Sequence, residues 1–278
     1  MKDRAYAKIN LSLDVFNIRE DGYHDIRSIM VPIDFYDELE IKIARENYYW
    51  CNKSYIKFND NNSIIKMINI LKDRFGINDS YEIRLNKYVP TKAGLGGGTA
   101  DGAGVLRIFE RLYKLDLSEE EKKEICLMVG ADVPFNYFNY PALVSGIGDE
   151  IERINILKEY YVLIVKPKLG VSTKQAYELL DMNKCDHPDI DRLKLALEKG
   201  ESIEGLLGNS LEQPSMLLNS EIEVIKNKMV DCGGVNILMS GSGSAVFCID
   251  EDKDRIKKMH ELFLNSKYYV RFTKTLNR

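Results

Sequence analysis

Apolar and polar side chains alternate along two stretches in the first half of the chain. Residues 7–15 place apolar side chains at odd positions and polar side chains at even positions, and residues 81–89 alternate in the same way. A period of two is typical of a strand with one buried face. The polar face of residues 7–15 carries Lys8, Asn10 and Ser12, and the alternation alone leaves open whether that face meets solvent or a ligand. Further strands are predicted in this half at residues 29–35 and 39–43.

Two segments of the first half combine the apolar spacing of a helix with signals at their ends. Residues 63–75 are predicted to form a helix with Ser63 as its N-cap. Ser118 and Glu121 form a capping box that starts another helix, which runs to residue 129 before Gly130 ends it.

The second half has strand and helix patterns in the order β-α-β-β-α-β, which suits a ferredoxin-like α+β domain. Residues 240–244 contain only Ser and Gly, and they predict either a hairpin turn or a second close approach of the backbone to a ligand. No Pro- or Gly-rich linker separates the halves, so we expect two closely packed domains, residues 1–155 and 156–278. Strands are predicted at residues 160–165, 235–239, 245–249 and 268–275, and helices at residues 173–182, 189–199, 220–231 and 253–264.

A glycine-rich loop, Pro90–Asp101, joins the strand pattern at 81–89 to a helix predicted over 99–113. Glycines permit positive φ and let a ligand approach the backbone, and the N–H groups at the start of the helix attract anions. The loop is neither a P-loop nor a dinucleotide fingerprint, because Thr99 stands where those need Lys or Gly. A nucleotide phosphate is the expected occupant, and a flexible surface loop is the alternative.

Composition and charge narrow the class of protein. The chain has 278 residues, a net charge of −4, and 39 Lys+Arg against 43 Asp+Glu, so no nucleic-acid-binding surface is predicted. The five cysteines form no C-x-x-C pair and the three histidines lie far apart, which argues against a zinc site or a disulfide framework. We expect no metal-ligand set of the protein's own. With no signal peptide or transmembrane stretch in the sequence, a cytoplasmic protein that does not bind membranes is expected.

Two charged residues are candidates for chemistry on a phosphate donor. Phosphoryl transfer needs a group that orients or deprotonates the acceptor hydroxyl, and Asp132 in Gly130–Pro134 is such a candidate. Lys8 is a candidate cation. Taken alone, such an Asp is more often a turn or cap residue, such a Lys is usually solvated, and Asp21–His24 is best interpreted as a surface turn.

Three separated motifs resemble the GHMP kinase family: Ala7–Leu11, Pro90–Asp101 and Ser240–Phe247. Two further segments, Arg19–His24 and Gly130–Pro134, narrow the resemblance to one member, an enzyme of the non-mevalonate route to isoprenoid precursors. The resemblance covers nearly the whole chain. It implies an α+β, two-domain GHMP kinase fold, with an N-terminal domain like ribosomal protein S5 and a C-terminal ferredoxin-like domain.

The resemblance also implies an activity. The γ-phosphate of ATP, neutralised by Mg²⁺, is transferred to the 2-hydroxyl of a diphosphocytidyl-methylerythritol. Asp132 is expected to take or orient the hydroxyl proton, with Lys8 beside it keeping the carboxylate ionised. The Thr99 hydroxyl is expected to help position magnesium. ATP binding is expected of Pro90, Thr91, Lys92, Ala93, Gly94, Leu95, Gly96, Gly97, Gly98, Thr99 and Ala100.

By the same resemblance, Asn10 and Thr173 lie near the methylerythritol portion of the acceptor. His24 reads the cytosine edge, Tyr177 stacks on the ring, and Tyr23 shapes that pocket. The chain departs from the family at Ile29 and Met30, where an aromatic residue often packs on cytosine; an adaptable Met can cover a ring face.

Other functions stay open at this point. A GHMP kinase with another acceptor, such as homoserine or mevalonate, has no use for Asp21–His24 together with Tyr177. A nucleotide-binding protein without catalysis would not need both Lys8 and Asp132. A nucleic-acid-binding protein conflicts with the acidic charge balance. The expected partner is a small-molecule substrate, and the expected state is a monomer or a weak homodimer.

Overall fold

The structure, a computed structural model, describes residues 1–20 and 22–277 and forms two compact units. Each unit is built from several stretches of chain, and β1 (Lys2–Ile18) and β2 (His24–Ala44) contribute residues to both. The first unit comprises Met1–Ala7, Phe35–Pro90 and Gly96–Asn139, and the second comprises Lys8–Asp34, Thr91–Leu95 and Tyr140–Arg278.

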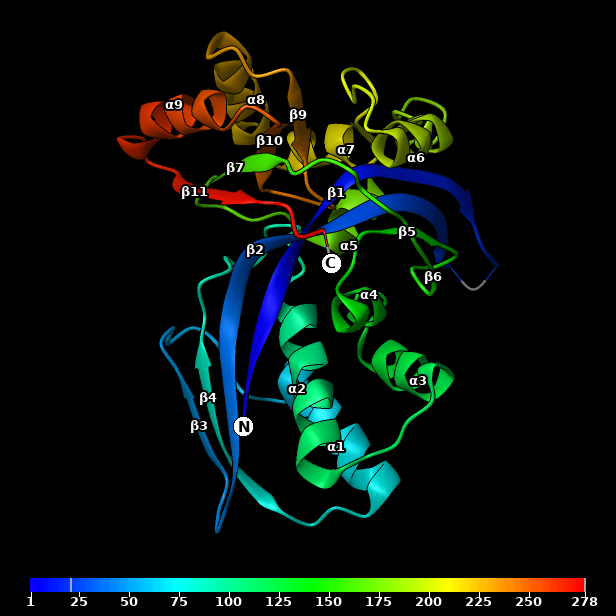
Figure 1. Ribbon diagram of the computed structural model, residues 1–278, viewed down its shortest axis with the longest axis vertical. Coiled ribbons are helices and arrows are strands. Elements are labelled where there is room, and N and C mark those ends of the chain that lie inside the picture. The colour runs from blue at the N-terminus through cyan, green and yellow to red at the C-terminus, as the bar shows by residue number, and fades with distance from the viewer. Residues whose placement is uncertain (21, 278) are drawn as a thin grey trace. The chain divides into compact units, whose positions relative to one another are not determined.

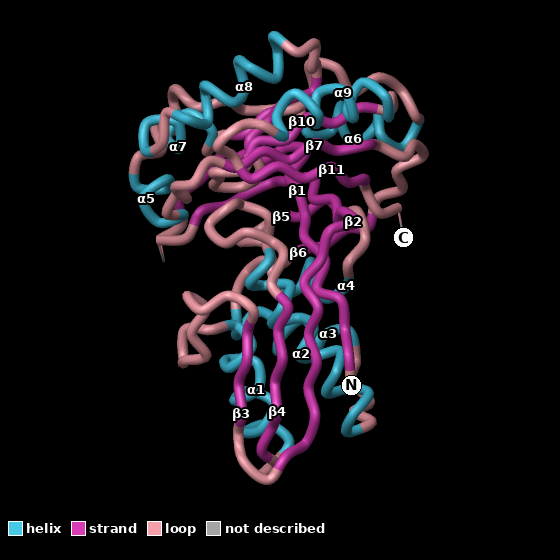
Figure 2. Tube along the Cα trace, turned by 90° about the vertical axis from the view of Figure 1, so that its left-hand side faces the viewer, coloured by secondary structure: helices cyan, strands magenta, loops and turns pink. Residues whose placement is uncertain are grey.

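The first unit is a sheet covered by helices (Figure 1). β4 runs antiparallel to β2, with Ile83 opposite Ile41, and β3 runs parallel to β4; Figure 2 shows these strands side by side. Leucines and isoleucines of β2 and β4 form one core with the apolar faces of α1 and α2. The remaining elements of this unit are β3 (Tyr48–Cys51), α1 (Ser63–Phe75), β4 (Ser80–Asn86), α2 (Gly97–Tyr113), α3 (Glu119–Val129) and α4 (Val133–Phe138).

Local signals explain where these helices begin. The prediction of Ser63 as an N-cap is wrong, because Asn62 has the extended backbone and its side chain accepts a hydrogen bond from the Ile64 N–H. The capping box between Ser118 and Glu121 is confirmed at the start of α3. α2 begins two residues earlier than predicted, with Gly96 as its N-cap at φ +68°.

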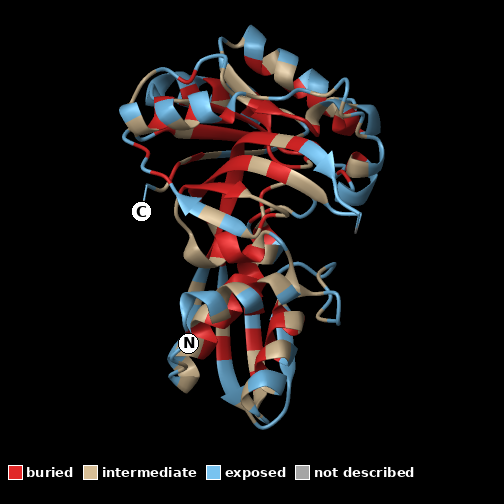
Figure 3. Cartoon of the chain, turned by 90° about the vertical axis from the view of Figure 1, so that its right-hand side faces the viewer, coloured by how far each residue is buried: buried red, intermediate tan, exposed pale blue. Residues whose placement is uncertain are grey.

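The second unit contains a four-stranded antiparallel sheet in the order β11-β7-β10-β9. Together with the intervening helices this is the ferredoxin-like β-α-β-β-α-β topology. α8 and α9 share a core with β7 and β10, and Figure 3 shows helices of this unit exposed along their outer faces. Its elements are β7 (Tyr161–Lys166), α5 (Thr173–Glu178), α6 (Ile190–Lys199), β8 (Gly208–Asn209), α7 (Glu212–Leu218), α8 (Glu221–Asp231), β9 (Asn236–Met239), β10 (Val246–Asp250), α9 (Lys253–Leu264) and β11 (Tyr269–Lys274).

A second group of strands in this unit surrounds the segments of β1 and β2 that belong to it. β5 (Ala142–Ser145) pairs antiparallel with β2, and β6 (Glu150–Arg153) pairs with β5. The two-residue strand β8 pairs parallel with β1, with Asn209 opposite Leu13. Every residue of β1 from Ala5 to Leu13 is buried, so both faces of the strand are covered there.

The structure differs from the predicted elements in three further ways. The strands predicted at 29–35 and 39–43 are parts of one strand, β2. The helix predicted over 173–182 stops at Glu178, since the Asp181 side chain accepts the Asn183 N–H and favours a turn over another helical turn. The pattern also missed six short elements, namely β3, α4, β5, β6, β8 and α7.

Candidate active site

The polar face of β1 is buried rather than solvated. Lys8, Asn10 and Ser12 are 3%, 1% and 0% exposed. The Lys8 ammonium donates to Asn10 Oδ1 at 2.7 Å, and Asn10 Nδ2 donates to the hydroxyl of Ser28 at 2.8 Å. A buried ammonium is retained only where polar groups compensate for its desolvation. The alternation in the sequence therefore marks a built polar site.

The Ser- and Gly-rich turn at residues 240–244 packs against residues 92–94 of the glycine-rich loop. Backbone N–H groups of Ser244 and Ala245 donate to the carbonyls of Lys92 and Ala93 at 3.3 and 3.1 Å. The Ser240 hydroxyl donates to the Gly94 carbonyl at 3.0 Å. Two segments far apart in sequence thus converge within the second unit.

Two glycines make this convergence possible. Gly94 has φ +72°, and a Cβ there would lie 1.8 Å from the Ser240 carbonyl oxygen. Gly241 has φ +53°, and a Cβ there would lie 3.3 Å from Asn10 Oδ1 and 3.4 Å from Lys8 Nζ. Of the two alternatives for residues 240–244, the structure contains the hairpin between β9 and β10, and its turn lies beside the polar face of β1.

Polar side chains that the sequence did not point to hold this turn in place. Asn209 Nδ2 donates to the carbonyls of Met239 and Gly241, both at 2.8 Å. The Ser215 hydroxyl donates to the Ser242 carbonyl at 3.1 Å. Isolated polar residues of this kind carry no periodic signal, so sequence patterns could not identify them. Thr173, which is predicted to contact the substrate that accepts the phosphate, also lies at this turn. Its hydroxyl oxygen is 2.7 Å from the hydroxyl oxygen of Ser242.

The first unit holds the start of α2, where the backbone is open to a ligand. Gly97 is buried, and a Cβ there would lie 2.9 Å from Val89 Cγ1, whereas a Cβ at Gly98 would meet nothing within 4 Å. The Thr99 hydroxyl donates to the Gly96 carbonyl at 2.8 Å and accepts from Asn136 Nδ2 at 2.8 Å. One oxygen lone pair of Thr99 remains for another ligand.

The residues of the glycine-rich loop that are predicted to bind ATP differ in how far they are buried. Ala93 and Leu95 are buried, at 2% and 1% exposure. The Leu95 carbonyl accepts the Lys8 N–H at 3.0 Å. The exposed members are Thr91, Lys92 and Gly98, the half-exposed members are Pro90, Gly94, Gly96 and Thr99, and Ala100 and Gly97 are buried.

Asp132 occupies the N-cap position of α4 in the first unit. Its side chain makes no capping hydrogen bond, and its carbonyl accepts from Asn136 Nδ2 at 2.8 Å. The same Asn136 amide reaches Thr99, so one side chain links Asp132 to the start of α2. The half-buried Asp132 thus stands at the N-cap position without the capping hydrogen bond that an Asp ordinarily makes there.

Two aromatic rings predicted for the cytosine pocket lie together in the second unit. The His24 and Tyr177 ring centroids are 4.8 Å apart and the rings are tilted by 42°. Burial lowers the pKa of His24 below its ordinary value, which favours the neutral imidazole. Tyr23 is 58% exposed, and Asp21 of the same motif lies outside the described residues. The pocket role considered for Met30 is not supported, because Ile29 and Met30 are core residues of β2 at 0% and 2% exposure.

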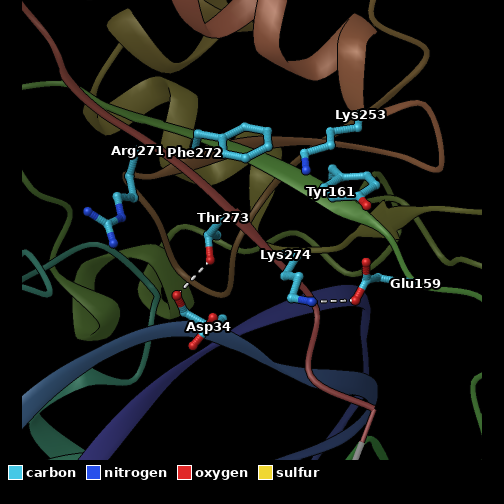
Figure 4. A pocket seen from close by; sticks show the side chains of 8 residues that line it. All are labelled: Asp34, Glu159, Tyr161, Lys253, Arg271, Phe272, Thr273 and Lys274. Atoms are coloured by element: carbon cyan, nitrogen blue, oxygen red, sulfur yellow. Dashed lines mark hydrogen bonds and ion pairs between the residues drawn. The ribbon is translucent and has the colours of Figure 1, made fainter.

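A separate hollow of about 310 Å³ lies on the second unit (Figure 4). Two of its charged side chains have partners within it: Lys274 binds Glu159 at 2.6 Å, and Lys253 lies over the Tyr161 ring. None of the residues predicted from the sequence lines this hollow. Its lining consists of Asp34, Glu159, Tyr161, Lys253, Arg271, Phe272, Thr273 and Lys274.

The described part of the chain offers neither a membrane span nor a cluster of metal ligands. No helix in residues 1–20 and 22–277 has the length and apolarity that a membrane crossing needs. In the same ranges no three His, Cys, Asp or Glu side chains are grouped so that they could hold a metal ion.

Comparisons with known proteins agree with this geometry. Residues 62–145 match the GHMP kinases N terminal domain, and residues 186–269 match the GHMP kinases C terminal domain. A 4-diphosphocytidyl-2-C-methyl-D-erythritol kinase of Clostridium beijerinckii is 39% identical over 91% of this chain and 91% of its own. The enzyme of the same name from Thermoanaerobacter pseudethanolicus is 37% identical over 100% of this chain and 97% of its own.

Solved structures show the same relationship. A crystal structure of 4-(cytidine 5'-diphospho)-2C-methyl-D-erythritol kinase has a TM-score of 0.83 and 28% identity, covering 99% of this chain and 100% of its own. Homoserine kinase from Cytophaga hutchinsonii has a TM-score of 0.74 at 17% identity, covering 98% of this chain and 94% of its own, and shares the fold.

The two-domain α+β GHMP kinase fold predicted from the sequence is therefore confirmed. GHMP kinases are ATP-dependent phosphotransferases, and this chain is a small-molecule kinase. The chain belongs to the GHMP kinase family and, within it, to the family of 4-diphosphocytidyl-2-C-methyl-D-erythritol kinases.

Proposed function

We propose that this chain transfers the γ-phosphate of ATP to the 2-hydroxyl of 4-diphosphocytidyl-2-C-methyl-D-erythritol, giving the 2-phosphate and ADP. The reaction belongs to the methylerythritol phosphate pathway to isoprenoid precursors. The observation that carries this proposal is the 36–39% identity over nearly the full chain to enzymes that bear this name. The polar site on β1 and the open start of α2 supply groups of the kind that phosphoryl transfer needs.

We assign ATP binding to residues 90–100. The free space around Gly98 supports this assignment, because it leaves room for a phosphate against backbone N–H groups at the positive end of α2. Mg²⁺ would supply charge neutralisation of the phosphates, and the remaining lone pair of Thr99 Oγ1 fits it as a ligand. Gly96 and Gly97 shape the turn that brings the backbone to the phosphate.

We assign the hydroxyl chemistry to Asp132 and Lys8. A carboxylate can accept the hydrogen bond of a hydroxyl and take its proton. The transition state of phosphoryl transfer is loose in most analyses, so orienting the hydroxyl counts for as much as deprotonating it. Lys8, held by Asn10, supplies a fixed positive charge.

We assign acceptor recognition to residues of the second unit. A neutral His24 has one N–H donor and one ring-nitrogen acceptor, which suits the mixed donor and acceptor edge of cytosine. The ring of Tyr177 lies beside the ring of His24. Tyr23, which precedes His24 in the sequence, is exposed. Asn10 and Thr173 are proposed to contact the methylerythritol portion.

Other features of the enzyme are proposals of the same kind. We propose that residues 1–155 and 156–278 are its two domains, that it acts in the cytoplasm, and that it is a monomer or a weak homodimer. Magnesium is proposed as the ion that accompanies ATP.

A coupled ADP-release assay tests the proposed function. ATP and Mg²⁺ are supplied with the diphosphocytidyl acceptor, and homoserine and mevalonate serve as parallel acceptors. ADP release with the cytidyl acceptor alone is expected. Release with another acceptor contradicts the pocket assigned to His24 and Tyr177, and no release with any acceptor contradicts catalysis.

A further inference from the structure

A cluster of three ionisable side chains is buried in the first unit. Asp37 of β2, Lys87 directly after β4 and Asp101 of α2 are 0%, 2% and 4% exposed. The Lys87 ammonium donates to Asp37 Oδ2 at 2.6 Å and to Asp101 Oδ2 at 2.5 Å. Charges this deep are scarcely screened by salt, so the cluster acts strongly on its surroundings.

The cluster fixes both chain segments that flank residues 90–96. On the strand side, Asp37 Oδ1 accepts the N–H groups of Tyr88 and Val89 at 2.6 and 2.8 Å. On the helix side, Asp101 lies in the second turn of α2. A Cβ at Gly97 would lie 3.1 Å from Lys87 Nζ, so the ammonium lies close to the first helical residue. One buried cation therefore ties the end of the strand to the start of the helix.

The charges in this cluster do not balance. Two carboxylates share one ammonium, which leaves a net charge of −1 when both are ionised. Asp101 Oδ1 is buried and has no hydrogen-bond partner in the part of the chain that the structure describes. A buried carboxylate oxygen without a partner is costly as an anion, and a proton shared with a second carboxylate relieves that cost.

The direction of the pKa shift agrees with this geometry. Burial raises the pKa of Asp101 to about 7, the charge of Asp37 also raises it, and the Lys87 ammonium opposes the rise. For Lys87, burial lowers the pKa, but the two carboxylates outweigh burial and raise it, so the ammonium stays charged. The thiol of Cys51, in β3, also interacts electrostatically with all three.

We propose that Asp37, Lys87 and Asp101 form a positioning cluster for the phosphate-binding start of α2, and that ATP binds most tightly when the cluster holds one additional proton. The inference rests on the proposed function, because it requires residues 96–100 to hold the phosphates of ATP. With the proton the cluster is neutral, and without it a buried negative charge lies within the helix that receives the polyphosphate. Coulomb repulsion across a poorly screened interior then weakens binding.

The test is the pH dependence of ATP binding by the full-length protein, measured as Kd for Mg·ATP by calorimetry from pH 6 to 8. ATP itself titrates in this range and affects the Kd of every protein equally. The informative quantity is therefore the difference in the pH dependence of Kd between the unmodified protein and each variant. We expect Kd of the unmodified protein to rise roughly three- to tenfold more over this range than Kd of Asp101→Asn, which keeps an acceptor for Lys87 but cannot ionise. The pH profile of KM for the cytidyl acceptor should be the same in both proteins. A general structural defect would instead change the binding of both substrates.

Glu82→Gln is the matched control, because Glu82 is a β4 carboxylate paired with Arg84 outside the cluster. It should follow the pH dependence of the unmodified protein. Asp37→Asn is the second variant, for use if Asp101→Asn does not fold, and it should flatten the profile in the same way. Equal slopes in all the folded proteins overturn this inference alone. Failure of the unmodified protein to bind ATP at any pH overturns the proposed function as well.

Discussion

Replacing Gly94 by Ala should destabilise the second unit far more than an ordinary Gly-to-Ala change. The new Cβ would lie 1.8 Å from the Ser240 carbonyl oxygen and 2.8 Å from its carbon, both backbone atoms. The 240–244 turn must therefore withdraw by roughly 1.5 Å to reach ordinary van der Waals distance.

The structure sets the size of the effect. Withdrawal breaks the bonds from Ser240 Oγ to the Gly94 carbonyl and from the N–H groups of Ser244 and Ala245 to the preceding loop. Each hydrogen bond contributes about 1 kcal/mol net, and the left-handed backbone adds about 1–2 kcal/mol of strain for a non-glycine residue. Together these amount to about 4 kcal/mol, which for a chain of this size lowers Tm by roughly 10 °C.

Gly205→Ala separates the clash from the backbone strain. Gly205 has φ +74°, close to the +72° of Gly94, but a Cβ there would meet nothing within 4 Å. Thermal unfolding by circular dichroism should show Gly205→Ala losing only the strain contribution of about 1–2 kcal/mol. Equal loss in the two variants would refute the argument that the close approach of the two loops holds this part of the enzyme together.

Three further predictions concern binding, catalysis and pH. Gly98→Ala should leave Tm unchanged or raise it slightly, since Ala in a helix is about 0.5–1 kcal/mol more stable than Gly. The same substitution should raise KM for ATP, because the new Cβ fills the open space proposed for phosphate. An unchanged KM argues against that placement of the phosphate. Asp132→Asn should lower kcat by roughly 10²–10⁴-fold with little change in either KM, and near-normal turnover would refute its role. The pKa of His187 is raised by its hydrogen bonds to the Met182 carbonyl and to Asp14, so its stabilisation is complete below about pH 6.5 and is lost as the pH rises through the folded pKa. Urea unfolding at pH 6 and pH 9 should show this loss in the unmodified protein and not in His187→Gln.

Elements with local sequence signals could be predicted from the sequence. The capping box at Ser118, the hairpin strands on either side of residues 240–244 and the alternation of β1 all describe contacts within a few residues. The boundary of α1 moved from Ser63 to Asn62 because both residue types cap helices, and only the backbone conformation decides between neighbours. Strands of two to four residues, such as β8, are too short for any period to emerge.

The long-range contacts of the site could not be predicted from patterns. Nothing in the sequence indicates that Asn209 holds the carbonyls of Met239 and Gly241, or that Lys87 lies between two carboxylates. Such contacts are set by topology, and each member alone resembles an ordinary surface residue. The resemblance supplied Lys8, Asn10 and the glycine loops as a group, and the structure adds the physical reason for the grouping in the second unit.

The position of the new phosphate tests the central claim most directly. The chain is incubated with ATP, Mg²⁺ and 4-diphosphocytidyl-2-C-methyl-D-erythritol, and the product is examined by proton-coupled phosphorus-31 NMR. The carbon that bears the 2-hydroxyl also bears the methyl group and has no hydrogen, so a 2-phosphate gives a phosphomonoester signal without three-bond coupling to hydrogen. We predict that unsplit signal, together with stoichiometric ADP. A doublet or triplet would place the phosphate on another hydroxyl, and absence of any new phosphomonoester would contradict the account as a whole.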